Sequence, residues 1–485
     1  RIHTCLDSRL QHAMEELFAD ESIYPPAAPN GELCQSAAVV MDSRGGIAAM
    51  IGGRTYQGAL CFNRATDAQR QPGSLIKPFV SYAPALELGG YSSASFIMDE
   101  PTDFDGYAPQ NYGGKFQGLM FLCDALAQSQ NVPAVKLLDE VGVNVGYAYA
   151  LRAGFPLQEE DRVLSLALGG ITHGVSPLDV CSAYAALAAE GVYHAPYTIR
   201  YITDKDGNIL YEHTPQTHFF ISRESAFELS CMLAHTVQTG TAAELAKLPI
   251  RLSAKTGTVD FSSIGNSDIW AAAYNSQYAA VVWMGMDQTN ANSYIPSAAT
   301  GGRHPVQALG KIFSAIYPKG SDVWFDTPEG IKQIDLDLTS SYLAAMPLLA
   351  SEHTPQNDRL TVYVKDENIP MDVGTYWSPP APPTDMHVQF DIFGVPVIRF
   401  SMQAEQAYYE LWRQDASGDS RLAVFDGAHH DVTYYDVTAP SGTALVYQVR
   451  AVHKASGAEG EFSAPIRTMR NAGLQLFGTT LPQDG

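Results

Sequence analysis

Residues 70–79 read RQPGSLIKPF and place a serine and a lysine three positions apart at the start of an apolar segment. Residues with this spacing share one face of a helix. The apolar pattern over 76–88 predicts that helix, and the two glycines at 89–90 mark its end. Taken alone, Ser74 and Lys77 would be interpreted as a helix cap and a surface charge.

A serine and a lysine on one helix face can also form a nucleophile and its base. A serine hydroxyl is a poor nucleophile until a base removes its proton. Lysine can do this only when neutral, and from an ordinary pKa of about 10.4 neutrality at pH 7 costs roughly 4.6 kcal/mol. Burial and a second nearby cation would each lower this cost. The side chains around Lys77 are suited to burial: Leu75, Ile76, Phe79 and Val80.

Two further short motifs supply what such a pair needs. Residues 129–131 read SQN before an apolar helical pattern, and 255–258 read KTGT within a predicted strand. Lys255 would be the second cation, and Gly257 has no side chain to obstruct a ligand lying along the strand. Taken singly, Asn131 would be interpreted as a helix cap and Lys255 as a strand-edge charge.

The apolar runs and helical patterns over residues 36–287 predict one antiparallel sheet with a large helical insertion. Residues 36–51 hold two apolar runs around a turn with two glycines, which predicts a β-hairpin. Residues 119–190 and 223–239 are rich in Ala and Leu and predict helices, and three short apolar strands follow within 250–287. The hairpin and these strands can join into a five-stranded antiparallel sheet, which makes this an α+β fold rather than a βαβ repeat.

The C-terminal part has a different texture. Residues 377–384 read WSPPAPPT, which predicts a stiff linker and a domain boundary. About seven short strands follow in about 100 residues, and this density predicts a β-sandwich. In the last of them, Tyr447 and Val449 alternate with polar residues, as in a half-buried strand. The predicted domains are therefore 1–376, the linker, and a sandwich over 385–485.

Composition and charge limit the classes of partner. The chain has 485 residues, of which 46% are hydrophobic and 17% charged, so we expect two or three folded domains. A net charge of -22 argues against nucleic acid or an anionic membrane surface as the main partner, because both bind basic faces. No apolar run approaches the roughly 20 residues of a membrane span. The chain begins at Arg1 without methionine or a secretory signal, so we interpret it as a processed piece whose N-terminal membrane anchor is missing.

The six cysteines form no C-x-x-C pair and no sequence cluster with histidine, so we expect no metal site. We interpret them as small buried hydrophobic side chains, with Cys181 and Cys231 inside helical patterns. A disulfide stays open, because the sequence cannot choose a pairing. The Asp103/Asp105 pair is more typical of a turn than of a metal site.

The ordered set SLIK (74–77), SQN (129–131) and KTGT (255–258) resembles the signature of the penicillin-binding protein and serine β-lactamase superfamily. Other segments resemble the transpeptidase domain of bifunctional, class A penicillin-binding proteins, among them FNRATDAQRQPGSLIKPF, PQNYGGKFQG, ALAQSQNVPAVKLL and GVSPLDVCSAYAALAAEG. The C-terminal part resembles a fibronectin type III-like module. The family's glycosyltransferase motifs are nowhere in this chain, and Cys123 stands where the family usually has an arginine.

This resemblance implies a serine D,D-transpeptidase that acts in peptidoglycan biosynthesis and is acylated by β-lactams. Ser74 would form an acyl-enzyme with a D-Ala-D-Ala stem peptide after Lys77 removes its proton. Ser129 would relay that proton towards the leaving amine, supported by Lys255. Asn131 would hold the substrate's amide and help to position the general base. An amine from a neighbouring stem peptide would then attack and give the cross-link.

The resemblance also implies how the substrate is held. Thr256 and Thr258 would receive its terminal carboxylate, and the peptide would pair with the strand edge beside Gly257. The backbone N–H groups of Ser74 and Thr258 would form an oxyanion hole, worth about 3–4 kcal/mol per donor in comparable acyl-transfer sites. Asn111 and Tyr112 could line the groove. No cofactor is implied.

Three alternatives stay open at this point. A D,D-carboxypeptidase would pass the acyl group to water, and a β-lactamase would hydrolyse it quickly, although this chain is long for one. A non-catalytic wall-binding or scaffold protein is motivated by the linker and the sandwich, which could bind cell-wall polymer or proteins of division or elongation. In each case we expect an extracytoplasmic location in the bacterial cell envelope and no nucleic-acid partner.

Overall fold

The structure is a computed structural model that describes all residues except 56–57, 59–60, 89, 263, 427–429 and 472–485. Contacts divide the chain into two compact units, Arg1–Ile334 with Thr361–Ile369, and Asp335–Leu360 with Pro370–Gly485. Each unit has a hydrophobic core of its own. The domain assignment based on the Pro-rich linker stays a prediction.

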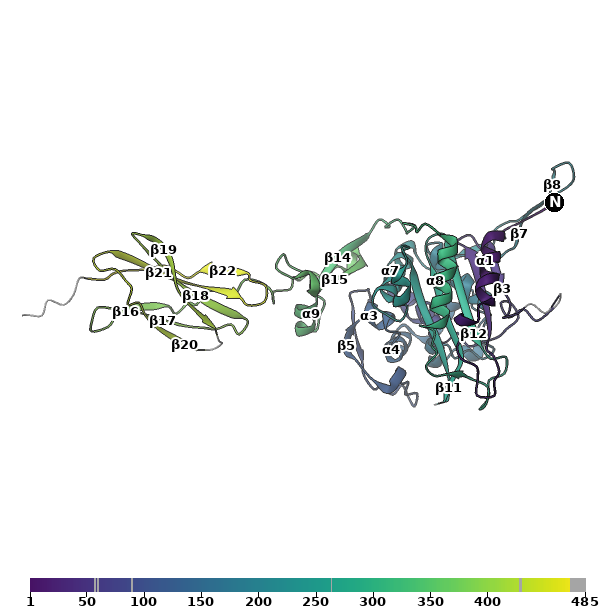
Figure 1. Cartoon of the computed structure of the whole chain (residues 1–485), viewed down its shortest axis with the longest axis horizontal. Coiled ribbons are helices and arrows are strands. Elements are labelled where there is room, and N and C mark those ends of the chain that lie inside the picture. The colour runs from purple at the N-terminus through teal and green to yellow at the C-terminus, as the bar shows by residue number, and fades with distance from the viewer. Residues whose placement is uncertain (56–57, 59–60, 89, 263, 427–429, 472–485) are drawn as a thin grey trace, which may run out of the picture. The chain divides into compact units, whose positions relative to one another are not determined.

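The first unit is built around an antiparallel sheet (Figure 1). Its strands lie in the order β10, β11, β12, β2 and β3, and a short β13 pairs with β11. Strands β10 to β12 form a meander, and the hairpin joins it through the pairing of β2 with β12. This confirms the predicted five-stranded sheet. The strand bounds are Ser253–Phe261, Gly265–Tyr274, Tyr278–Gly285, Gln35–Asp42, Ile47–Ile51 and, for β13, Ile295–Pro296.

Most helices of the first unit lie in the predicted insertion between β3 and β10. The helices of the unit are α1 (Ser8–Ala19), η1 (Glu21–Ile23), η2 (Gly73–Ile76), η3 (Pro78–Tyr82), α2 (Ala83–Glu87), η4 (Tyr112–Gly114), α3 (Leu122–Ala127), α4 (Asn131–Val141), α5 (Val143–Arg152), η5 (Glu159–Asp161), η6 (Leu164–Leu168), α6 (Pro177–Ala188), α7 (Arg223–Gln238), η7 (Ala243–Lys247), α8 (His304–Ile316) and η9 (Asp366–Asn368). Small sheets complete it with β1 (Ile2–Thr4), β4 (Phe96–Asp99), β5 (Gly118–Phe121), β6 (Val192–His194), β7 (Ile199–Thr203), β8 (Ile209–Glu212) and β9 (Thr217–Phe219).

Helices cover both faces of the main sheet because its side chains alternate between the two faces. On one face, Val40 and Val282 share a buried cluster with residues of α1 and α8, which Figure 1 shows beside each other. On the other face lies α6, where Cys181 Sγ is 3.5 Å from the carbonyl oxygen of Val39. Ser176 precedes α6 (Pro177–Ala188) as its N-cap and forms a capping box with Asp179.

The helix predicted over 76–88 lies where the sequence placed it, but it is not one regular α-helix. It consists of a 3₁₀ turn (η2), a π-helical turn (η3) and a short α-helix (α2). Pro78 and Pro84 explain the breaks, because each lacks the N–H that a regular helix uses. Gly89, at the predicted end, lies outside the described residues.

The second unit carries two antiparallel sheets, β16–β17–β20 and β19–β18–β21–β22 with β23 paired to β21. Their inward side chains form its core, which includes Ile398, Phe400, Leu411, Tyr447 and Val449. The bounds are His387–Phe390, Pro396–Ser401, Ala407–Asp415, Gly418–Asp426, Asp431–Tyr435, Ala444–His453, Glu459–Phe462 and Ile466–Met469 in chain order. Before them in this unit come α9 (Leu338–Ala344) and η8 (Gln356–Asp358), and the strands β14 (Ile331–Asp337) and β15 (Arg359–Lys365) have residues in both units. The predicted strands are present, and the fibronectin type III-like assignment stays a prediction.

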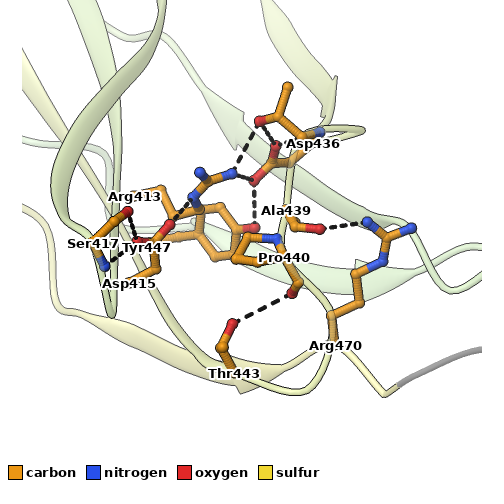
Figure 2. A network of polar contacts seen from close by, with 10 residues as sticks. Arg413, Asp415, Ser417, Asp436, Ala439, Pro440, Thr443, Tyr447 and Arg470 are labelled. Carbon is orange, nitrogen blue, oxygen red and sulfur yellow. Dashed lines mark hydrogen bonds and ion pairs between the residues drawn. The ribbon is translucent and has the colours of Figure 1, made fainter.

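A buried polar network joins these two sheets (Figure 2). Arg413 of β18 donates to Asp436 Oδ2 over 2.8 Å, and the Tyr447 hydroxyl of β21 donates to the same oxygen over 2.7 Å. Asp436 follows β20 of the other sheet and is fully buried. Breaking one partner of a buried pair typically destabilises a fold by about 3–5 kcal/mol, because the remaining charge stays buried and unpaired. The network therefore helps to fix how the two sheets pack.

Among the described residues, no helix is long and apolar enough to cross a membrane.

Candidate active site

The turn η2 presents Ser74 at the surface of the first unit while it buries Lys77. Ser74 is half-buried, and Lys77, which follows the turn directly, is 0% exposed. Within the described part of the chain, no hydrogen bond joins Ser74 Oγ to Lys77 Nζ. Such contacts are often loose in an unliganded site and tighten when substrate binds.

Three oxygens of the SQN motif surround Lys77. Its Nζ lies 2.6 Å from Ser129 O, 2.9 Å from Gln130 O and 2.7 Å from Asn131 Oδ1. An ammonium group has three N–H donors, so these acceptors suit its charged form. The fold therefore brings the first two motifs into direct contact, although 52 residues separate Lys77 from Ser129.

Lys255 approaches the same serine from β10. Its Nζ donates to Ser129 Oγ over 2.6 Å and to Thr256 O over 2.9 Å. Ser129 adopts a left-handed backbone conformation with φ of 60°, which is uncommon for a residue other than glycine. In this conformation the Ser129 carbonyl accepts a hydrogen bond from Lys77, and its hydroxyl accepts one from Lys255. Such backbone strain costs about 1–3 kcal/mol and concentrates at functional sites.

Burial dominates the electrostatics of both lysines. Burial, with the charge of Lys255 as a second cause, holds the pKa of Lys77 well below its ordinary value, while Asp99 acts in the opposite direction. Burial lowers the pKa of Lys255 to about 7. The three acceptors around Lys77 favour its charged form and therefore oppose part of the lowering of its pKa. They do not fully compensate for the water that the charged amine loses on burial. Lys77 is therefore suited to giving up its proton.

Two glycines let η2 lie directly against β10. A Cβ on Gly257 would stand 2.6 Å from Pro72 O, closer than real side chains come. Gly73 has φ of 57°, and a Cβ there would stand 2.9 Å from Thr258 O. Trp270 Nε1 donates to Gln71 O over 3.0 Å and holds the start of the turn. The KTG glycine therefore sets the distance between the serine and the strand.

Gly257→Ala is expected to push η2 away from β10, because the new methyl meets a backbone oxygen that cannot rotate aside. We expect a loss of stability of about 1–3 kcal/mol, typical of overpacking, and a slower acylation of Ser74. Gly310→Ala in α8 is the matched control, since its Cβ would meet nothing nearer than 3.6 Å. Urea unfolding and penicillin acylation of both variants measure the difference. Equal behaviour of the two variants would contradict the packing argument.

The threonines of KTGT already have partners. Thr256 Oγ1 lies 2.6 Å from Thr241 Oγ1, and Thr258 Oγ1 accepts from Gly301 N over 3.1 Å. Strand β10 is at one end of the sheet order, so no strand among the described residues pairs with its outer edge.

Sequence reasoning missed two residues that support the site. Asp99 is buried under the SQN segment, and Thr241 bonds to Thr256. Nothing in the local sequence marks Asp99, whereas Thr241 lies within TGTAAELA (239–246), a segment that resembles the same family. Asn111, predicted as a groove residue, is buried and accepts from Asn131 N over 2.8 Å, whereas Tyr112 is 72% exposed.

The fold also groups side chains that sequence spacing keeps apart. The ligand atoms of Cys123, Asp124 and His235 lie within 4.8 Å of one another, and Asp124 Oδ1 is 2.7 Å from His235 Nε2. This contact joins α3 to α7. The expectation of no metal site stays a prediction. All six cysteines are free among the described residues, and Cys61 is exposed, so the interpretation of the cysteines as buried side chains is wrong for Cys61.

Known proteins are similar to this chain in sequence and in fold. A family model described as the penicillin binding protein transpeptidase domain matches residues 36–304, more than half of the chain. Penicillin-binding protein 1F of Bacillus subtilis is 33% identical over 332 residues, which are 68% of this chain and 45% of that protein. Penicillin-binding protein 1A/1B of the same organism is 29% identical over 389 residues, 77% of this chain and 41% of that protein. The chain thus spans less than half the length of these two relatives.

Solved structures agree on the fold. Penicillin-Binding Protein 1A from Haemophilus influenzae superposes with a TM-score of 0.60 at 24% identity, over 71% of this chain and 56% of that one. The penicillin-binding protein PonA1 from Mycobacterium tuberculosis gives 0.58 at 24% identity, over 67% of this chain and 87% of that one. From the ordered motifs, the matched family model and this fold, the chain belongs to the penicillin-binding proteins and carries the transpeptidase domain of their class A members.

Proposed function

We propose that this chain is a serine D,D-transpeptidase that cross-links peptidoglycan stem peptides through an acyl-enzyme on Ser74. The observation that carries the proposal is the environment of Lys77. It is fully buried, it lies one turn from Ser74, and its Nζ contacts the SQN motif. A lysine with a lowered pKa beside an accessible serine is the arrangement that nucleophilic catalysis needs.

In the acylation step, neutral Lys77 removes the proton of Ser74 Oγ, and Oγ attacks the carbonyl carbon of the penultimate D-alanine. The oxygen that becomes negative is held by the backbone N–H groups of Ser74 and Thr258. The proton passes by way of Ser129 Oγ, which already bonds to Lys255, to the leaving D-alanine amine. The amide bond breaks, and the donor peptide remains as an ester on the serine.

In the second step, the amine of a neighbouring stem peptide attacks that ester. It gives up a proton along the same route, and Ser74 leaves with its own proton restored. During both steps the donor peptide lies along the open edge of β10, with Thr256 and Thr258 facing its terminal carboxylate. Asn131 holds the substrate's amide. β-Lactams would acylate the same serine, because their strained amide mimics this peptide bond.

The proposal places the protein outside the cytoplasm, in the bacterial cell envelope. The second unit is the candidate binding site for cell-wall polymer or for proteins of division or elongation. Peptidoglycan stem peptides supply both donor and acceptor, and the reaction needs no cofactor.

A donor peptide ending in D-Ala-D-Ala, mixed with an amine acceptor, tests the proposal. We expect release of D-alanine together with a new peptide joined to the acceptor. Release of D-alanine with water as the only acceptor would favour the carboxypeptidase, and fast hydrolysis of a penicillin would favour the β-lactamase. A chain that binds cell-wall polymer but releases no D-alanine would favour the scaffold.

A further inference from the structure

Asp99 is a fully buried carboxylate at the end of β4, close to the site but outside the three motifs. Its Oδ1 and Oδ2 accept from Asn111 Nδ2 over 2.7 and 2.9 Å, and Oδ2 also accepts from Gln117 N over 2.9 Å. A carboxylate at neutral pH can only accept hydrogen bonds. It therefore determines which end of the Asn111 amide faces it.

With its nitrogen held by Asp99, Asn111 must turn its oxygen the other way. That oxygen accepts from Asn131 N over 2.8 Å and from Val132 N over 3.2 Å. These are the first two N–H groups of α4, which have no partner within the helix. Asn111 thus caps α4 from a distant loop and fixes the position of Asn131.

The side chain of Asn131 in turn contacts the proposed base, Lys77. Its Nδ2 donates to Gln110 O over 2.7 Å, which leaves Oδ1 to accept from Lys77 Nζ over 2.7 Å. A continuous line of hydrogen bonds therefore runs from Asp99 through Asn111 and Asn131 to Lys77. Its members come from β4, the loop before η4, α4 and the turn after η2.

Asp99 also acts on Lys77 through its charge. Lys255 from β10 lowers the pKa of Lys77, and Asp99 raises it. Burial, together with the charges of Cys123 and Asp99, raises the pKa of Tyr82 in η3, and Lys136 pairs with Glu100. Asp99 thus counters the effect of Lys255 on the proposed base.

We propose that Asp99 is the positioning residue for Lys77: it fixes the Asn111 amide that holds Asn131 in place, and its carboxylate stabilises the lysine's charged form. This inference rests on the proposed function, because it assigns Lys77 the task of a base. Asp99 does not touch the substrate. Its effect reaches the reaction only through Lys77.

Asp99→Asn tests the inference because it keeps the shape and removes the charge. Without that charge the pKa of Lys77 falls further, so the neutral base persists to lower pH. The acid limb of the pH profile of penicillin acylation should shift down by about 1 pH unit. The maximum rate should fall tenfold to hundredfold, because Asn111 loses the carboxylate that orients its amide. Asp103→Asn, an exposed aspartate of the following turn, is the matched control and should change neither.

The outcomes separate the inference from the proposed function. A wild-type protein that no penicillin acylates overturns the proposed function and this inference with it. An acylated wild type with an unshifted acid limb in Asp99→Asn overturns the inference alone. If Asp99→Asn does not fold, Asn111→Ala is tested instead. This variant breaks the series of hydrogen bonds from Asp99 to Lys77 but keeps the charge of Asp99. This variant should lose rate at least tenfold without a shift of the acid limb, and an unchanged rate would overturn the inference.

Discussion

Ser74→Ala is expected to abolish both D-alanine release and the covalent penicillin adduct. The alanine lacks the oxygen that forms the ester with the donor peptide or the penicillin. Residual peptide cleavage from substrate binding and the oxyanion hole alone should lie several orders of magnitude below the wild-type rate. The fold should survive, because Ser74 is half-buried and the change removes a single atom.

Intact mass after incubation with benzylpenicillin measures the adduct, and chromatography of D-alanine measures turnover. Ser314→Ala is the matched control, since Ser314 is exposed on α8 and bonds only to Gly310 O. The control should retain the adduct and the full rate. An adduct of unchanged yield on Ser74→Ala would remove Ser74 from the mechanism.

Lys77→Met is expected to slow acylation about 10²–10⁴-fold, the usual contribution of a general base. Methionine has a similar length and carries no charge, so it can fill the buried space that Lys77 occupies. The pH profile of the remaining acylation should lack the acid limb of the wild-type profile, because the group that titrates there has been removed. Wild-type acylation should slow as the pH falls through the lowered pKa of Lys77, since only the neutral amine removes a proton.

Stopped-flow acylation by a chromogenic β-lactam across a range of pH measures this effect. Lys311→Met is the matched control, because the Lys311 side chain is 53% exposed on α8. It should leave the rate and the pH profile unchanged. Acylation of Lys77→Met within threefold of the wild type would show that another group acts as the base.

The sequence predicted well those features of the fold that depend on residues close together in the chain. Short continuous apolar runs in β2, β3 and β10 to β12 reflect burial on both faces of the sheet, and these runs identified the sheet and its hairpin. The segment after Ser74 was predicted as one regular helix, yet it changes from 3₁₀ to π to α. The apolar period gives the place of a helix but not the hydrogen-bond pattern that prolines impose.

The site was predictable only as far as its motifs extend. The family resemblance implied that Asn131 would help to position Lys77, and Asn131 Oδ1 lies 2.7 Å from Lys77 Nζ. The left-handed backbone of Ser129 and the burial of Asp99 depend on contacts between distant segments. Local sequence carries no signal for such contacts, so these features emerge only when the fold is known.

Peptide mapping of the penicillin adduct tests the central claim most directly. The protein is incubated with benzylpenicillin and digested, and each peptide is weighed and fragmented. We expect one penicilloyl group per chain, located on Ser74 within the peptide that contains SLIK. A penicilloyl group on any other residue, or none after prolonged incubation of the folded protein, would contradict the assignment of Ser74 as the nucleophile.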